Sequence, residues 1–176
     1  MKPGLSEFLG YSADNQQGWL MSLICVQKEA FNPGDEINAF STRNSNSGAI
    51  TSFVGQMRNF RGPDRTKGMP INTMLLEHYS GMAERQLSDL ASSAQSRWPL
   101  DDILIIHRYG ELKPGAPSVL VATASSHREP AFDACRFLMD WLKTQAPFWK
   151  KEISADGANW VESEESDKAK AARWNR

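Results

Sequence analysis

Residues 125–152 read SSHREPAFDACRFLMDWLKTQAPFWKKE, and the rest of the chain is organised around this stretch. Pro130 suits the first turn of a helix, where its missing N–H leaves no hydrogen bond unmade. Apolar residues then recur at helical spacing until Pro147 ends the helix, which predicts one buried helical face. The predicted face consists of Phe132, Cys135, Met139 and Leu142. The residues after Pro147 predict an extended segment that turns back.

Basic side chains stand at both ends of this helical unit. His127 and Arg128 come just before the helix, Lys143 lies in its last turn, and Lys150 lies beyond Pro147. A helix N-terminus favours an anion, so His127 and Arg128 form a candidate anion site. The alternative is that His127 only caps the helix and Arg128 is solvated. A lysine in the last turn also complements the helix dipole without any further function.

Other candidate residues are weaker when each is taken alone. Lys150 is either the solvent side of a strand or, beside Phe148 and Trp149, a partly desolvated lysine able to exchange protons. Arg58 follows a predicted strand and is either a phosphate ligand or merely exposed. His78 and His107 stand at strand ends and are interpreted as structural. The sequence contains no spacing of His, Cys, Asp or Glu that resembles a metal site.

Composition limits the classes of function. With 176 residues, 40% of them hydrophobic, the chain is long enough for one domain with a real core. The net charge of −1 gives no global field for nucleic acid or an anionic membrane, so any anion site must be local. Cys25 and Cys135 lie in apolar runs and are predicted to be buried free thiols. No secretory signal or membrane span is expected, which makes the cytoplasm the default location.

The order of elements favours an α+β fold with a mixed sheet. Helices are predicted over residues 33–40, 82–98 and 130–146, and a glycine- and proline-rich connector over 110–117. Strands are predicted over residues 20–28, 49–57, 71–78, 102–109, 118–125 and 149–161. Residues 1–18 are expected to be a loose extension, 19–161 the domain, and 162–176 a charged tail whose helix formation and packing the sequence leaves open. Residues 59–70 are a candidate lid, and the six tryptophans are assigned to the core by default.

Five segments resemble, in order and spacing, the large, catalytic subunit of molybdopterin synthase. They are FVGQMR at 53–58, LEHY at 76–79, HRYGEL at 107–112, SHR at 126–128 and KTQAPFWK at 143–150. The resemblance extends from about residue 20 to about residue 161. Its last motif is specific, because lysines flanking a TQAPFW turn meet no general structural need.

The resemblance implies an α/β hammerhead fold, a homodimer, and a small ubiquitin-like subunit at each end of a heterotetramer. The small subunit's C-terminal Gly-Gly thiocarboxylate would enter a pocket of this chain. There it would sulfurate cyclic pyranopterin monophosphate twice, which gives the dithiolene of molybdopterin. No permanently bound cofactor, metal, nucleic acid or membrane partner is implied.

Site residues follow from the same resemblance. Lys143 would support an acyl-enzyme-like intermediate between tail and pterin, and Lys150 would exchange protons during ring opening and sulfur transfer. Arg58, His127 and Arg128 would hold the substrate phosphate, with contributions from both chains of the dimer. Further substrate-binding candidates are Gln56, Met57, Lys151 and Glu152, where Glu152 is placed to orient Lys150 through a salt bridge. Phe53 and Met139 are candidate pocket walls, although both are more often core residues.

The chain departs from the family pattern in three places. The extension before Trp19 is long, and residues 62–70 expand the loop after Arg58. Glu164 stands where some relatives carry an arginine, which Arg61 or Arg65 could replace. Two rival functions are a non-catalytic scaffold that binds a ubiquitin-like tail and an enzyme acting on another phosphate ester. A scaffold would have no reason to keep Lys143 and Lys150 beside the His127-Arg128 pair. A phosphate-ester enzyme would need a nucleophile–base pair or a metal cluster, and the sequence shows neither.

Overall fold

The larger sheet is built around β6 (Asp102–Arg108) and β8 (Pro117–Ser125). The structure, a computed structural model, describes the chain except residues 1–20, 62–67, 155–156, 162–164 and 175–176. β6 reads DILIIHR and every residue in it is buried, as expected for a strand covered on both faces. It pairs in parallel with β1 (Met21–Gln27) and antiparallel with β8, and β8 pairs antiparallel with β2 (Ala49–Gln56). The order β1-β6-β8-β2 therefore gives the mixed sheet that the sequence predicts.

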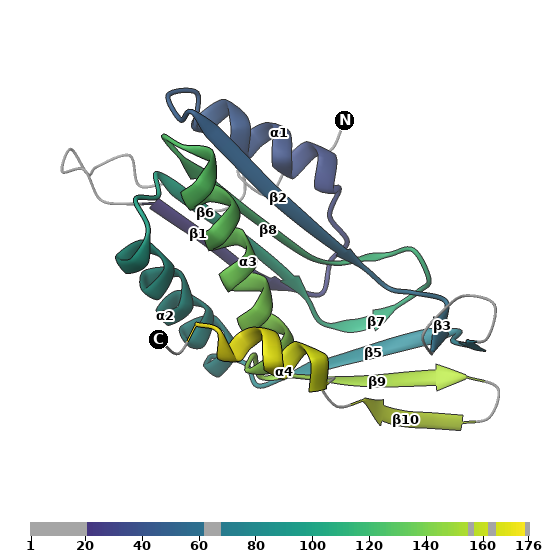
Figure 1. The fold of residues 1–176 in the computed structure, drawn as a ribbon. Coiled ribbons are helices and arrows are strands. Elements are labelled where there is room, and N and C mark those ends of the chain that lie inside the picture. The colour runs from purple at the N-terminus through teal and green to yellow at the C-terminus, as the bar shows by residue number, and fades with distance from the viewer. Residues whose placement is uncertain (1–20, 62–67, 155–156, 162–164, 175–176) are drawn as a thin grey trace.

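Helices cover both faces of this sheet, as Figure 1 shows. Alternation along β6 sends Leu104 and Ile106 toward α1 (Pro33–Arg43), where they meet Phe40. Ile103 and Ile105 point the other way, into a core shared with α2 (Met82–Arg97) and α3 (Arg128–Thr144). The face of α2 that packs into this core consists of small and aliphatic residues, all of them buried: Ala83, Leu87, Leu90, Ala91 and Ala94.

A second sheet has the order β10-β9-β5-β7 and continues beyond the helices (Figure 1). Its strands are β5 (Thr73–His78), β7 (Gly110–Leu112), β9 (Phe148–Ser154) and β10 (Gly157–Val161), all paired antiparallel. A short hairpin of β3 (Phe60–Arg61) and β4 (Met69–Pro70) precedes β5. A separate core cluster lies at this sheet and contains Met57, Ile71, Met74, Leu76 and Leu112.

The buried face of α3 differs from the predicted one at Phe132. Cys135 is buried, and Met139 and Leu142 pack against the main core, but 59% of Phe132 is exposed. Ala131 and Ala134 instead face β8, and their small side chains allow close packing there. Thr123 Oγ1 on β8 donates to the Ala131 carbonyl oxygen at 2.8 Å. The prediction is wrong at Phe132, because the closely packed interface with β8 accommodates the small alanine side chains and leaves the larger ring outside.

The C-terminal segment, whose packing the sequence left open, packs on the domain. α4 (Glu165–Ala172) lies against α3, and the Trp174 ring contacts those of Trp98 and Phe137 at centroid distances of 5.6 and 5.5 Å. Trp174 Nε1 donates to Asp140 Oδ2 at 2.8 Å. Trp174 is the one aromatic residue in the charged stretch 162–176, so composition alone does not predict that the segment packs.

Several smaller expectations are also revised. β7 forms inside the connector over 110–117, and the ends of the 59–70 segment pair as β3 and β4. Trp149 and Trp160 are about half exposed and are not core residues. The extension over 1–18, the middle of the candidate lid and Glu164 lie outside the described residues. Within the part of the chain that the structure describes, each helix is too short or too polar to cross a membrane.

Candidate active site

The predicted cations lie at opposite ends of α3. His127 and Arg128 are at its N-terminus, and Lys143 is an exposed residue of its last turn. The helix has 17 residues, and at 1.5 Å per residue it is about 24 Å long. A substrate the size of a pterin cannot contact both ends of one copy of α3. The two groups of candidate residues therefore lie apart on one chain, and we name their surroundings the N-terminal and the C-terminal half-site.

The N-terminal half-site is a surface hollow of about 530 Å³ lined by Gly48, Ser126, His127, Arg128 and Glu129. His127 occupies the N-cap position in extended conformation, but its side chain makes no capping hydrogen bond. The interpretation of His127 as a simple cap is therefore not supported.

Gly48 was missed by the sequence analysis and shapes the same hollow. A Cβ at this position would lie 2.2 Å from the carbonyl oxygen of Ser126, which is a severe clash with backbone. Only glycine lets the start of β2 approach the residue before His127 this closely. Nothing in the local sequence shows this, because the two segments meet only in the folded chain.

The C-terminal half-site is built by the turn that joins α3 to β9. The Gln145 N–H donates to the Trp141 carbonyl at 2.8 Å, and the Phe148 N–H donates to the Ala146 carbonyl at 2.8 Å. β9 then pairs with β5, with Phe148 opposite His78 and Lys150 opposite Leu76. The turn thus carries the chain directly from Lys143 into the strand that bears Lys150.

A buried carboxylate holds Lys150. Lys150 Nζ lies 2.6 Å from Glu152 Oε1, and Arg61 Nε lies 2.6 Å from the other oxygen, Oε2. The Glu152 side chain is only 4% exposed, whereas 34% of Lys150 and 39% of Arg61 are exposed. The expected ion pair of Lys150 and Glu152 is therefore present, and Arg61 joins it from β3.

The two cations control the charge of Glu152. Burial alone raises the pKa of the Glu152 carboxyl, but hydrogen bonds from Lys150 and Arg61 and their positive charges outweigh it. The net result is a pKa below the ordinary value for glutamate. Glu152 is therefore ionised at neutral pH.

An aromatic stack fixes the start of β9. The His107 and Phe148 rings are stacked at a centroid distance of 3.7 Å, and His78 packs on Tyr109 at 4.2 Å. Burial lowers the pKa of His107 to about 4, opposed by its hydrogen bond to the Arg108 carbonyl and assisted by the charge of His78. His107 is therefore neutral at pH 7, in agreement with its interpretation as structural.

The structure does not bring every predicted residue to these half-sites. Lys151 lies on the face of β9 opposite to Lys150, with its Nζ 5.2 Å from the centre of the Trp160 ring. Met57 is buried in the cluster at the second sheet, so its side chain packs in the core, and its contact with substrate stays a prediction. Arg58 is exposed, and its guanidinium carbon lies 5.3 Å from the centre of the Phe60 ring.

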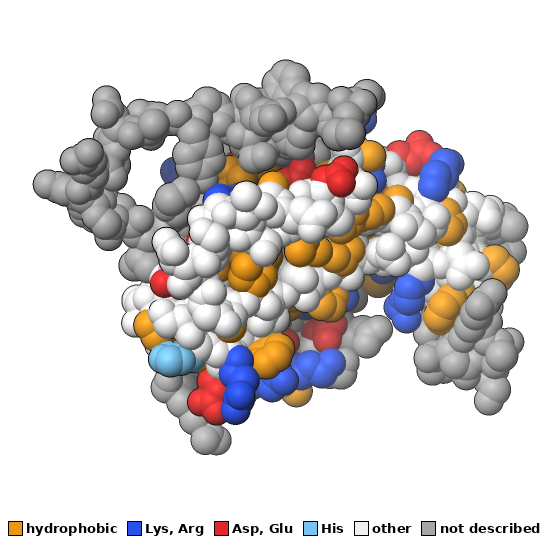
Figure 2. Space-filling model, turned by 90° about the horizontal axis from the view of Figure 1, so that it is seen from above, with side chains coloured by type: hydrophobic (Ala, Val, Ile, Leu, Met, Phe, Trp, Pro, Cys, Tyr) orange, Lys and Arg blue, Asp and Glu red, His pale blue; other side chains and the backbone are white. Residues whose placement is uncertain are grey.

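The remaining candidates lie on β2 and α3. Gln56 is exposed at the end of β2, after an irregularity in its pairing with β8. Phe53 is 41% exposed on the same strand, so it is available as a pocket wall. Met139 is partly buried against the main core. Figure 2 shows that hydrophobic and basic side chains lie side by side on the face seen from above.

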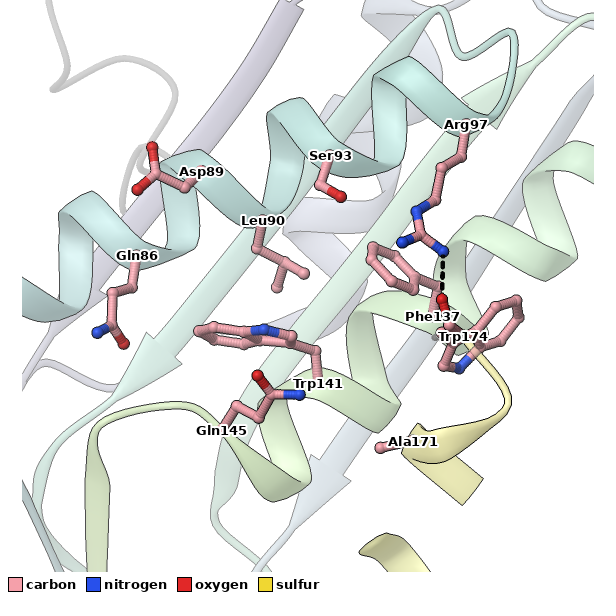
Figure 3. Close-up of a pocket in the computed structure, with 10 residues that line it drawn as sticks. All are labelled: Gln86, Asp89, Leu90, Ser93, Arg97, Phe137, Trp141, Gln145, Ala171 and Trp174. Atoms are coloured by element: carbon pink, nitrogen blue, oxygen red, sulfur yellow. Dashed lines mark hydrogen bonds between the residues drawn. The ribbon is translucent and has the colours of Figure 1, made fainter. Parts of the chain in front are cut away.

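Another hollow, of about 460 Å³, lies between α2, α3 and the C-terminal segment (Figure 3). Phe137, Trp141 and Trp174 form its aromatic walls, and Arg97 Nη1 donates to the Trp174 carbonyl at 3.0 Å across it. None of the predicted site residues lines this hollow. Among the described residues no group of three or more His, Cys, Asp or Glu is placed to hold a metal ion.

Comparison with known proteins identifies the same family as the sequence resemblance. The model of the MoaE protein family matches residues 26–145, more than half of the chain. The molybdopterin synthase catalytic subunit of Pseudomonas aeruginosa is 51% identical over 86% of this chain and 97% of that protein. The MoaE protein structure from Burkholderia ambifaria MC40-6 is 42% identical, with a TM-score of 0.72 over 89% of this chain and 99% of the other. The complex of subunits 1 and 2 of molybdopterin-converting factor from Helicobacter pylori 26695 shares the fold at 18% identity, with a TM-score of 0.63 over 81% and 90%.

Proposed function

The chain belongs to the MoaE family of molybdopterin synthase catalytic subunits, sulfur-transferring enzymes of molybdenum cofactor biosynthesis, and from this premise we propose how it acts. It takes sulfur from the C-terminal thiocarboxylate of a small ubiquitin-like subunit. Two such transfers convert cyclic pyranopterin monophosphate to molybdopterin. The relative from Helicobacter pylori was solved as a complex of two subunits, which supports a partner of this kind.

The observation that carries the proposal is the pair Lys143 and Lys150 on either side of one tight turn. The donor thiocarboxylate and the substrate phosphate are both anions, so their approach needs compensating positive charge. In the proposed reaction Lys143 stabilises the intermediate between tail and pterin. Lys150, held by Glu152 at 2.6 Å, has a fixed position from which to exchange protons with the reacting groups.

The phosphate of the substrate binds at the N-terminus of α3 from the partner copy. His127, Arg128 and the first-turn N–H groups suit an anion there. Because α3 is about 24 Å long, a complete site needs the N-terminal half-site of one chain beside the C-terminal half-site of another. Arg58 adds a further exposed cation for the phosphate.

A twofold dimer with antiparallel α3 helices meets this requirement, because it places each N-terminus near the other's C-terminus. α3 packs against β2, and each element exposes a large apolar side chain, 59% of Phe132 and 41% of Phe53. Burial of these two rings would contribute to a dimer interface. One small subunit at each complete site gives a heterotetramer.

The test combines the purified chain with a thiocarboxylated small subunit and cyclic pyranopterin monophosphate and measures molybdopterin. We expect Lys143→Ala and Lys150→Ala each to lower the rate by about 100-fold or more, because charge stabilisation and proton transfer are lost. Far-ultraviolet circular dichroism controls for folding. Folded variants that form product at the wild-type rate would refute the assigned roles.

A further inference from the structure

Arg61, which lies outside the five motif segments, forms an ion pair with Glu152. It lies in the short β3 strand, 91 positions before Glu152 in the sequence, yet its Nε contacts Glu152 Oε2 at 2.6 Å. Lys150 Nζ contacts the other oxygen of the same carboxylate at 2.6 Å. One carboxylate is therefore shared by two cations.

The charges of this cluster explain why a second cation matters. Lys150 and Glu152 alone would sum to zero, and an approaching anion would meet a neutral pair. Arg61 adds one positive charge, so the three groups keep a net charge of one. Because Glu152 is only 4% exposed, little water screens its negative charge from Lys150.

We propose that Arg61 is a positioning residue that neutralises Glu152, so that the charge of Lys150 acts on the anionic tail of the small subunit. This inference rests on the proposed function, in which Lys150 faces that tail. Glu152 then fixes the position of Lys150 without cancelling its charge.

Backbone hydrogen bonds hold the segment around Arg61 in place. The Ile71 N–H donates to the Asn59 carbonyl at 2.9 Å and closes the base of the β3–β4 hairpin. The Asn72 N–H donates to the Ile153 carbonyl at 2.9 Å and ties this base to β9 beside Glu152. The hairpin that carries Arg61 is thus attached to β9, the strand that carries Lys150 and Glu152.

The chain offers a closely matched control. Arg43 Nε contacts Asp102 Oδ2 at 2.6 Å, and the Asp102 side chain is 3% exposed. The donor atom, distance and carboxylate burial therefore match those of Arg61 and Glu152. Asp102 belongs to the larger sheet and has no part in the proposed site, so this pair reports the structural effect of losing a buried ion pair.

The experiment measures the dissociation constant of a small subunit that ends in an unmodified Gly-Gly carboxylate, over a series of salt concentrations. We expect Arg61→Gln to weaken binding about tenfold at low salt, with a flatter salt dependence, because one charge is lost near the tail. Arg61→Lys should recover part of the affinity. Arg61→Gln combined with Glu152→Gln should recover most of it, because the net charge returns to one.

Arg43→Gln should lower thermal stability and leave the dissociation constant unchanged. The inference is overturned if Arg61→Gln weakens binding no more than Arg43→Gln, or if the double variant binds no better than Arg61→Gln alone. Because these comparisons need binding only, they decide the role of Arg61 separately from catalysis. Wild-type protein that binds the small subunit but forms no molybdopterin would refute the proposed function instead.

Discussion

Burial decides the charge of His107 and, with it, part of the stability of the C-terminal half-site. The ring is stacked under Phe148, and its pKa is lowered to about 4 from an ordinary value of 6.5. As the pH falls below 6.5, His107 becomes protonated in the unfolded chain. In the folded chain it becomes protonated only near pH 4. His107 therefore lowers stability progressively between these values and no further below them.

This linkage gives a pH prediction. Between pH 7 and pH 4 the free energy of unfolding should fall by about 3 kcal/mol more in wild type than in His107→Phe, which keeps a ring against Phe148. Urea denaturation across this pH range measures the difference. Glu152 has a lowered pKa in both proteins, and its contribution is lost only as the pH falls through that value, so it cancels in the comparison. Parallel curves for the two proteins would contradict the assignment.

Contacts between residues close in the sequence were predictable, whereas contacts between distant residues were not. Lys150 and Glu152 are two positions apart on a predicted strand, so their shared face and ion pair followed from strand alternation. Arg61 and Gly48 act through contacts with residues 91 and 78 positions away. Such contacts exist only after folding, and for this reason Arg61 was foreseen as a spare cation and not as the partner of Glu152.

At the scale of elements, the long periodic segments were predictable. The helices α2 and α3 and the strands of the larger sheet lie where apolar spacing placed them, to within a few residues. The strands β3, β4 and β7 have only two or three residues, which is too short for a period to appear. Phe132 shows a further limit, because periodicity indicates a helix but does not decide whether alanine or phenylalanine faces the sheet.

Strand β9 separates two lysines that look equivalent in the sequence. Lys150 shares a face with Glu152, and Lys151 points to the other face toward Trp160. Lys151→Ala should therefore lower the rate of molybdopterin formation by less than about threefold, against about 100-fold or more for Lys150→Ala. Steady-state assays of both variants test this prediction, and each variant is the control for the other, because both remove one lysine from the same strand. Equal losses would show that the face of β9 does not determine function.

For the whole molecule, the length of α3 is the decisive quantity. Both groups of cations and their order can be read from the sequence, but the distance between them in space cannot. A helix of 17 residues keeps them about 24 Å apart in one chain. The proposed active site uses both groups, so it needs a second copy of the chain to complete it.

The most direct test is complementation between subunits. Arg128→Ala and Lys143→Ala chains are coexpressed with different affinity tags, and the mixed dimer is isolated through both tags. In this dimer one site carries both substitutions and the other carries neither, so we predict about half of the wild-type kcat/KM per dimer, while each parent dimer has almost none. A mixed dimer as inactive as its parents would place both groups in one chain and contradict the composite site.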